Sequence, residues 1–160
     1  MATGAHTLKN IVVALDGSKE AEAIWPYVES IARAFNARLT FVCALVPVED
    51  TVPGEFALTE ASLAPEVLES VYETHDLVGE KDASYLARVK KRWSDLGFDV
   101  ASEEPPLRAA QAIVEIAREK RADLIAMTTH GRRGMSRAVL GSVADEVVRT
   151  APCSVLLVRQ

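Results

Sequence analysis

Small and basic residues gather in one stretch of the chain, MTTHGRRGMSRAVLGS at residues 127–142. Glycine permits positive φ and a close approach of backbone to a ligand, and the stretch holds Gly131, Gly134 and Gly141. Gly141 and Ser142 open a predicted helix, whose first amides are unpaired and carry partial positive charge. The Ser142 hydroxyl adds a donor, and Arg132 with two further arginines adds counter-charge. These groups suit a phosphate chain, although an ordinary connection between a strand and a helix has a similar composition.

A second candidate is the Asp-Gly-Ser turn at residues 16–18, directly after an apolar run. The Asp16 carboxylate does not favour a phosphate at close range, but it can accept hydrogen bonds from ribose hydroxyls or touch a phosphate-bound Mg²⁺ ion. Ser18 adds a hydroxyl to the same turn. The open alternative is that Asp16 is a turn former or a helix N-cap, because Asp side chains often bond to nearby backbone N–H groups.

The elements that must position these residues alternate along the chain. Short apolar runs rich in β-branched residues predict buried strands, in the segments 10–18, 38–46, 98–104, 122–129 and 154–159. Apolar residues at three- and four-residue steps predict helices, over 18–36, over 67–71 resuming at 86–96, over 108–120 and over 142–151. Pro26 is expected to kink the first predicted helix or displace its start. Gly97 is expected to end the helix predicted over 86–96. Ser142 and Asp145 have the spacing of a capping box.

This alternation predicts an α/β fold of one domain, residues 1–160. We expect a doubly wound five-stranded parallel sheet in the order 3-2-1-4-5, with helices on both faces and right-handed crossovers. Ligands in such sheets bind outside the carboxyl ends of the strands, where the strand order reverses. The turns after the first and fourth predicted strands are therefore expected to converge on one crevice, although more than a hundred residues separate them.

Composition and charge exclude several classes of protein. A net charge of −5 excludes a general phosphate-backbone binder, because nucleic-acid affinity needs a large basic surface. No apolar run reaches the roughly 18 residues of a membrane span, and the start of the chain has no signal-peptide pattern, so we expect a cytoplasmic protein. Cys43 and Cys153 lie in or beside apolar runs and are predicted to be reduced, strand-buried thiols. The histidines fit no metal-ligand pattern, and no metal site is expected.

The usual nucleotide motifs are absent, since the chain has neither GxxxxGK[ST] nor GxGxxG. Over essentially its whole length, from NIVVALDGS to APCSVLLVR, the chain instead resembles the universal stress protein family. That family has a nucleotide-binding signature of Gly, two residues, Gly, nine residues, Gly, then Ser or Thr. Gly131 matches its second glycine, and Gly141 with Ser142 matches the last pair. Thr128 stands where the signature has its first glycine.

The resemblance implies binding of ATP, or of AMP or cyclic AMP, with Mg²⁺ held only through the nucleotide phosphates. By alignment with the family, Asp16 would meet the ribose or adenine side, Leu45 would offer its backbone to the adenine, and Gly141 to Val143 would cradle the phosphates. The complete set of expected binding residues is Ala14, Leu15, Asp16, Ser18, Leu45, Met127, Thr128, Gly131, Arg132, Gly134, Gly141, Ser142 and Val143.

The resemblance also implies a homodimer, often formed through the last strand of each subunit. Residues 154–159 are an apolar strand expected at the sheet edge, and pairing across a two-fold axis would cover that edge.

Three functions fit the sequence. The first is a stress-response protein that binds ATP as a sensor or switch, with slow hydrolysis or none, because no pattern fixes a base and a charge clamp around a phosphate. The second is an enzyme of adenylate or ATP-hydrolysis chemistry, for which no substrate domain or catalytic motif is found. The third is a stress protein that acts through dimerisation and partner binding without nucleotide, which the Thr128 departure favours.

Overall fold

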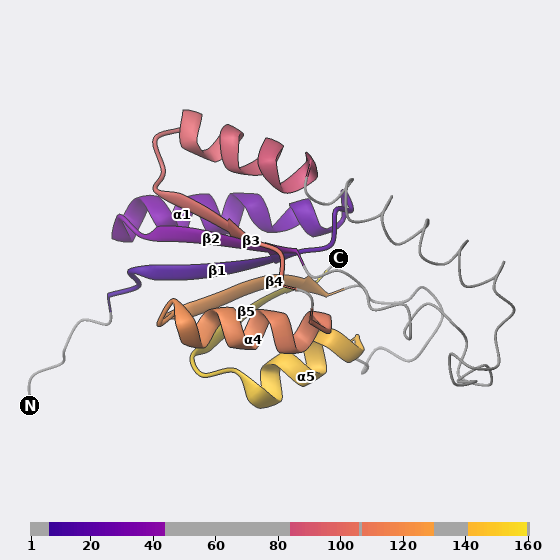
Figure 1. Ribbon diagram of the computed structural model, residues 1–160. Helices are drawn as coiled ribbons and strands as arrows, with labels where there is room; N and C mark the ends of the chain where they lie inside the picture. Colours follow the sequence, from indigo (N-terminus) through magenta and orange to yellow (C-terminus); the bar gives the residue numbers. More distant parts are fainter. Residues whose placement is uncertain (1–6, 44–83, 106, 130–140, 160) are drawn as a thin grey trace, which may run out of the picture.

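Five parallel strands form one sheet in the computed structural model, which describes residues 7–43, 84–105, 107–129 and 141–159 (Figure 1). The strands are β1 (Asn10–Leu15), β2 (Arg38–Cys43), β3 (Val100–Glu103), β4 (Leu124–Thr129) and β5 (Ser154–Arg159). They lie in the order β3-β2-β1-β4-β5, and each pair of neighbours is parallel. The predicted fold class and strand order are confirmed.

Helices cover both faces of the sheet, as predicted (Figure 1). The chain passes through η1 (Ala21–Ile24), α1 (Trp25–Phe35), an unlabelled helix whose described residues are 84–95, α4 (Ala109–Glu119) and α5 (Ser142–Thr150). We call the side covered by α1 and the 84–95 helix the α1 face, and the side covered by α4 and α5 the α4 face. The predicted helical residues 67–71 and strand residues 44–46 lie outside the described residues.

The two faces each have their own apolar core, because β1, β2 and β4 are buried on both sides. Alternate residues such as Val13 and Phe41 pack on the α1 face, and Val12 and Ile125 pack on the α4 face. Burying one such side chain contributes about 1.5–3 kcal/mol. The continuous apolar runs of the sequence are therefore what a sheet between two helix layers requires.

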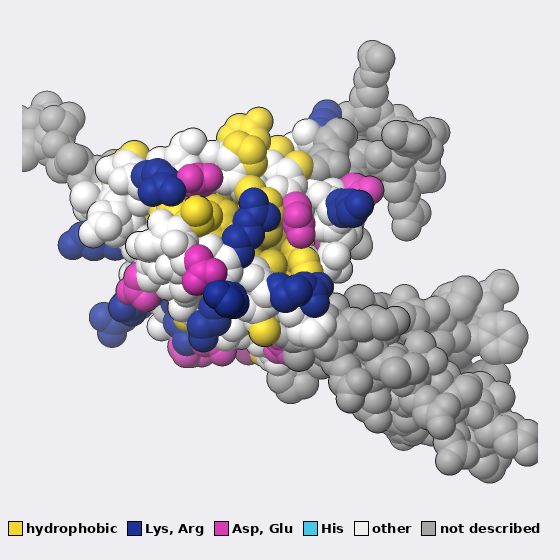
Figure 2. Space-filling view, turned by 90° about the horizontal axis from the view of Figure 1, so that it is seen from above, with side chains coloured by type: hydrophobic (Ala, Val, Ile, Leu, Met, Phe, Trp, Pro, Cys, Tyr) yellow, Lys and Arg dark blue, Asp and Glu magenta, His cyan; other side chains and the backbone are white. Residues whose placement is uncertain are grey.

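An aromatic cluster fills the α1 face. Trp25 lies edge-on to Phe41 at 5.7 Å between ring centroids, and Trp93 lies 5.3 Å from Trp25 and 5.0 Å from Phe98. Outside this cluster, charged side chains surround the remaining hydrophobic ones on the surface of the same face (Figure 2). Several are paired along their own helix, as Arg33 is with Glu29 at 2.9 Å. Exposed pairs of this kind contribute little to stability, so the aromatic cluster and the buried strands hold this layer.

Two predicted helix boundaries are confirmed. Pro26 displaces the start of α1, because proline has no N–H and is accommodated in the first turn; the chain before it forms the short 3-10 helix η1. Gly97 ends the 84–95 helix with a φ of +87°. Its N–H donates to Ser94 O at 2.9 Å and the Phe98 N–H donates to Trp93 O at 3.1 Å, which is the Schellman motif.

The start of β1 is fastened to the start of β4 by the side chain of Asp123. Its Oδ2 accepts hydrogen bonds from the backbone N–H groups of Lys9 at 2.7 Å and Asn10 at 2.9 Å. The Asp123 N–H donates in turn to Asn10 O at 2.8 Å. This clip fixes the register of the two central strands, and so fixes which residues meet where those strands end.

The prediction for the cysteines is half right. Cys43 ends β2 and is buried. Cys153 precedes β5 in a turn and is only half-buried, so its assignment to a buried strand is wrong. The neighbouring Pro152 has no N–H for a sheet ladder, and β5 begins only at Ser154. Partial burial, with the nearby Asp123 charge, raises the pKa of the Cys153 thiol.

Within the described ranges, no helix is both long and apolar enough to cross a membrane.

Candidate functional site

Asp16 and Gly141, one from each of the two segments singled out in the sequence, lie at the same end of the sheet. Asp16 directly follows β1, and Gly141 directly precedes α5. The carboxyl ends of parallel strands all lie at the same end of the sheet, and a helix that connects two of these strands must start there. Figure 1 shows the ends of β1 and β4 and the first turn of α5 at one end of the sheet. Asp16 and the start of α5 therefore lie at the same end of the sheet, and residues 130–140, which follow β4, lie outside the described residues.

The neighbouring ends of β1 and β4 bring four of the expected binding residues together. The last paired residues of these strands are Val13 and Ala126, and the next along each strand are Ala14 and Met127, followed by Leu15 and Thr128. Ala14 and Met127 are buried in the core of the α4 face, against which Val143 of α5 also packs. Leu15 packs in the core of the α1 face. Thr128 is half-buried and pairs in register with Val158 of β5.

Asp16 forms the turn that sequence reasoning left as its alternative role. Its Oδ1 accepts hydrogen bonds from the Ser18 N–H at 3.0 Å and the Ser18 Oγ at 2.6 Å. Gly17 has a φ of +75°, which a residue with a side chain rarely adopts. The Ser18 Oγ accepts from the Ala21 N–H at 3.0 Å and so joins the turn to η1. Asp16 is exposed, and its Oδ2 accepts no hydrogen bond from a described residue.

The start of α5 presents backbone N–H groups beside an open backbone position. Gly141 is the N-cap, and its carbonyl accepts the Asp145 N–H at 2.9 Å. The N–H groups of Ser142, Val143 and Ala144 precede that first intrahelical bond and have no partner within the helix. Gly141 has an ordinary φ of −58°, so the positive φ that glycine permits is not used here. Among the described residues, apart from its chain neighbours and its own helix backbone, a Cβ placed on Gly141 would meet no atom within 4 Å.

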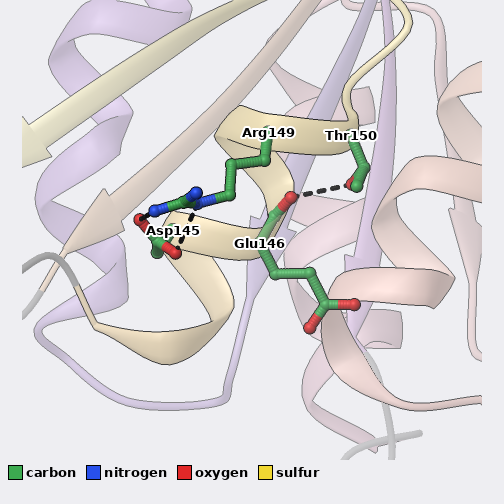
Figure 3. A network of polar contacts seen from close by, with 4 residues as sticks. All are labelled: Asp145, Glu146, Arg149 and Thr150. Carbon is green, nitrogen blue, oxygen red and sulfur yellow. Dashed lines mark hydrogen bonds and ion pairs between the residues drawn. The ribbon is translucent and has the colours of Figure 1, made fainter.

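The predicted capping box of Ser142 and Asp145 is wrong. Gly141 takes the cap position, and Ser142 is the first residue inside the helix, where its side chain makes no capping bond. Asp145 instead pairs one turn ahead with Arg149, at 2.8 Å to Nε and 3.2 Å to Nη2 (Figure 3). The charged guanidinium is a stronger partner for a carboxylate than a backbone N–H. Ser142 is exposed in the first turn of α5.

Four further expected binding residues, Leu45, Gly131, Arg132 and Gly134, lie outside the described residues. The described residues of the candidate site therefore form two parts, the Asp16 turn and the start of α5.

Comparison with known proteins identifies the family. The model of the universal stress protein family matches residues 7–159. A universal stress protein of Methanocaldococcus jannaschii is 32% identical over 157 residues, which cover 98% of this chain and 85% of that protein. The chain belongs to the universal stress protein family.

Solved structures share the universal stress protein fold. One, a hypothetical protein whose biochemical function was assigned from its structure, has a TM-score of 0.77 at 22% identity, covering 97% of this chain and 98% of its own. Another, a universal stress protein in complex with cAMP, has a TM-score of 0.58 at 22% identity, covering 96% and 98%. At this level of identity the likeness establishes the architecture.

Sequence reasoning missed two residues beside the Asp16 turn of this universal stress protein. Tyr85, in the 84–95 helix, is 8% exposed, and its hydroxyl donates to Glu22 Oε1 of η1 at 3.4 Å. Burial first, and then the Glu22 charge, raise the pKa of Tyr85, with smaller contributions from Cys43 and Asp16. The only signal in the sequence was that Tyr85 borders the apolar stripe of its helix, because 63 residues separate the two partners.

The opposite edge of the sheet has a separate groove of about 650 Å³. It lies where β1 and β2 begin, and three of the charged side chains that line it have partners. Arg38 pairs with Asp99 at 2.6 Å, and the Arg33 guanidinium lies 4.7 Å from the centroid of the Phe98 ring. Ligands of doubly wound sheets bind at the carboxyl ends of strands, so this groove is not assigned to the candidate site.

Proposed function

We propose that this universal stress protein binds ATP, or another adenine nucleotide such as AMP or cyclic AMP, as a sensor or switch of the stress response in the cytoplasm. The observation that carries the proposal is the start of α5. Three N–H groups without a helical partner stand beside Gly141, whose glycine is required neither by its φ nor by described neighbours. A phosphate chain accounts for that glycine, because a side chain there would occupy the path of the phosphates.

The Asp16 turn supplies the second half of the proposed site. Oδ1 is used within the turn, and Oδ2 is left to accept hydrogen bonds from ribose hydroxyls. A bare triphosphate beside a carboxylate is unfavourable, and Mg²⁺ bound to the phosphates would reduce that repulsion. Ser142 would donate its hydroxyl to the phosphates. The complex of a related universal stress protein with cAMP supports an adenine nucleotide as the ligand.

We expect this site to bind nucleotide with little or no hydrolysis. Efficient hydrolysis requires a base that positions water and a charge clamp on the leaving phosphate. Asp16 is the carboxylate of the turn in the proposed site, and one of its oxygens is committed to Ser18. The alternative is an enzyme of adenylate or ATP-hydrolysis chemistry. Such an enzyme would release pyrophosphate or phosphate at a rate proportional to its own concentration.

Isothermal titration calorimetry separates these functions. ATP, AMP and cyclic AMP are each titrated into the protein with millimolar Mg²⁺, and a phosphate-release assay is run in parallel. Saturable binding of at least one of them, with turnover no faster than the background of a heat-denatured sample, is the expected result. Absence of binding to all three would leave the nucleotide-free stress protein as the function, and sustained turnover would make it an enzyme.

We also propose that two subunits pair through β5. This strand is the edge of the sheet next to β4, and its apolar residues Val155 to Val158 are only half-buried. An exposed apolar edge strand favours association, and antiparallel pairing across a two-fold axis would bury it.

Sedimentation equilibrium is expected to give twice the mass of the 17.3 kDa chain at micromolar concentration. Leu156→Lys should shift the equilibrium to the single chain, and a monomeric parent protein would contradict the proposal.

A further inference from the structure

The short helix η1 carries the Asp16 turn but has few bonds of its own. It has four residues, and the side chain of its N-cap residue makes no capping hydrogen bond. The Ser18 Oγ, which also donates to Asp16, accepts the N–H of Ala21, the first residue of η1. The apolar residues Ala21 and Ile24 are buried and anchor one side of η1. Ser18 thus joins the Asp16 turn to η1.

Glu22 is on η1, and its carboxylate accepts the hydroxyl of Tyr85. Among the described residues, this is the one side-chain hydrogen bond from η1 to another element. The bond is partly buried and, at 3.4 Å, long for a hydroxyl donor. Tyr85 comes from the 84–95 helix, which is packed into the core of the α1 face through Leu86, Val89 and Trp93. The hydrogen bond therefore connects Glu22 to a helix that is packed in the core of the α1 face.

The chain of contacts runs from the core to the Asp16 carboxylate, which Ser18 holds through Oδ1. Tyr85 holds Glu22, Glu22 belongs to η1, η1 is joined through Ala21 to Ser18, and Ser18 holds the Asp16 carboxylate. Each link in this chain is either a hydrogen bond or the backbone of η1. The start of α5 is not part of this chain of contacts.

From these contacts we propose that Tyr85 and Glu22 are a positioning pair for the Asp16 turn, and that loss of the Tyr85 hydroxyl weakens nucleotide binding without contact between Tyr85 and the ligand. The proposal rests on the function proposed above. Tyr85 is a positioning residue, since its hydroxyl acts through Glu22 and η1.

The test is a calorimetric titration of ATP with Mg²⁺ into Tyr85→Phe. We expect a dissociation constant roughly three- to tenfold larger than that of the parent, because the hydrogen bond that joins η1 to the 84–95 helix is lost. Tyr27→Phe is the matched control, since Tyr27 is half-exposed on α1 and makes no side-chain bond to a described residue; its constant should match the parent. Glu22→Gln keeps an oxygen acceptor and should lose less affinity than Glu22→Ala.

Comparing Tyr85→Phe in the parent and in the Asp16→Ala background distinguishes action through Asp16 from a general structural role of Tyr85. If Tyr85 acts through Asp16, Tyr85→Phe should weaken binding in the parent and have no further effect once Asp16 is removed. Equal losses in both backgrounds would overturn the proposal, as would an unchanged affinity of Tyr85→Phe.

Amide hydrogen exchange tests the pair without any nucleotide. The N–H groups of Ser18 and Ala21 are bonded within the turn, and both should exchange faster in Tyr85→Phe than in the parent, while amides of α5 should not change. If the parent binds no nucleotide, the proposed function fails and this measurement still decides the positioning pair. Unchanged exchange at Ser18 and Ala21 would overturn it.

Discussion

Gly141→Val should abolish detectable ATP binding while the protein stays folded. A branched side chain at this position would project beside the first amides of α5, where the phosphates are proposed to lie. We expect the affinity to fall by at least roughly 100-fold, about 2.7 kcal/mol. The fold should tolerate the change, because the φ of −58° suits any residue and a Cβ would meet no atom within 4 Å. Valine is a poorer N-cap than glycine, at a cost of about 1 kcal/mol or less.

Calorimetry with ATP and a urea unfolding curve measure the two halves of this prediction. Gly97→Ala is the matched control, because Gly97 also has open space around it but has a φ of +87° and ends the 84–95 helix at the far edge. That variant should lose about 1 kcal/mol of stability through backbone strain and bind ATP as the parent does. Parent-like ATP affinity in Gly141→Val would remove the start of α5 from the site.

The architecture could be predicted because one physical signal decides it. Each buried strand is a short apolar run, and each helix has an apolar stripe, so the alternation of the two indicates a parallel sheet between helix layers. Even the weak segment 98–104 forms β3, a strand at the sheet edge that is half-buried along its length. Proline and glycine act locally, which is why Pro26 and Gly97 have the effects expected of them.

Contacts that depend on a choice between nearby partners could not be predicted in the same way. The Ser142 and Asp145 spacing fits a capping box, but Arg149 one turn ahead offers Asp145 a charged partner, and Gly141 takes the cap. Asp16 fits both a turn former and a ligand, and the geometry shows one oxygen in the turn with the other left over. The pair of Glu22 and Tyr85 joins distant segments, and no local pattern encodes such a bond.

Asp16→Ala should weaken ATP binding by roughly 1 to 3 kcal/mol, if its carboxylate accepts ligand hydroxyls in the complex. In dissociation constants this is a factor of roughly 5 to 150. The same substitution also removes two hydrogen bonds from the turn, because Asp16 Oδ1 accepts from both the N–H and the Oγ of Ser18. Loss of affinity alone therefore does not separate a ligand contact from a loosened turn.

Ser18→Ala separates them. It removes the Oγ bonds to Asp16 and Ala21 but leaves the carboxylate and the bond from the Ser18 N–H. If Asp16 contacts the ligand, Asp16→Ala should cost clearly more affinity than Ser18→Ala, while thermal unfolding shows similar losses of stability for both. Asp16→Asn, which keeps one oxygen acceptor, should fall between Asp16→Ala and the parent. Should the Ser18 and Asp16 variants lose affinity equally, or should only their melting temperatures change, Asp16 is a turn former and the ribose contact must come from elsewhere.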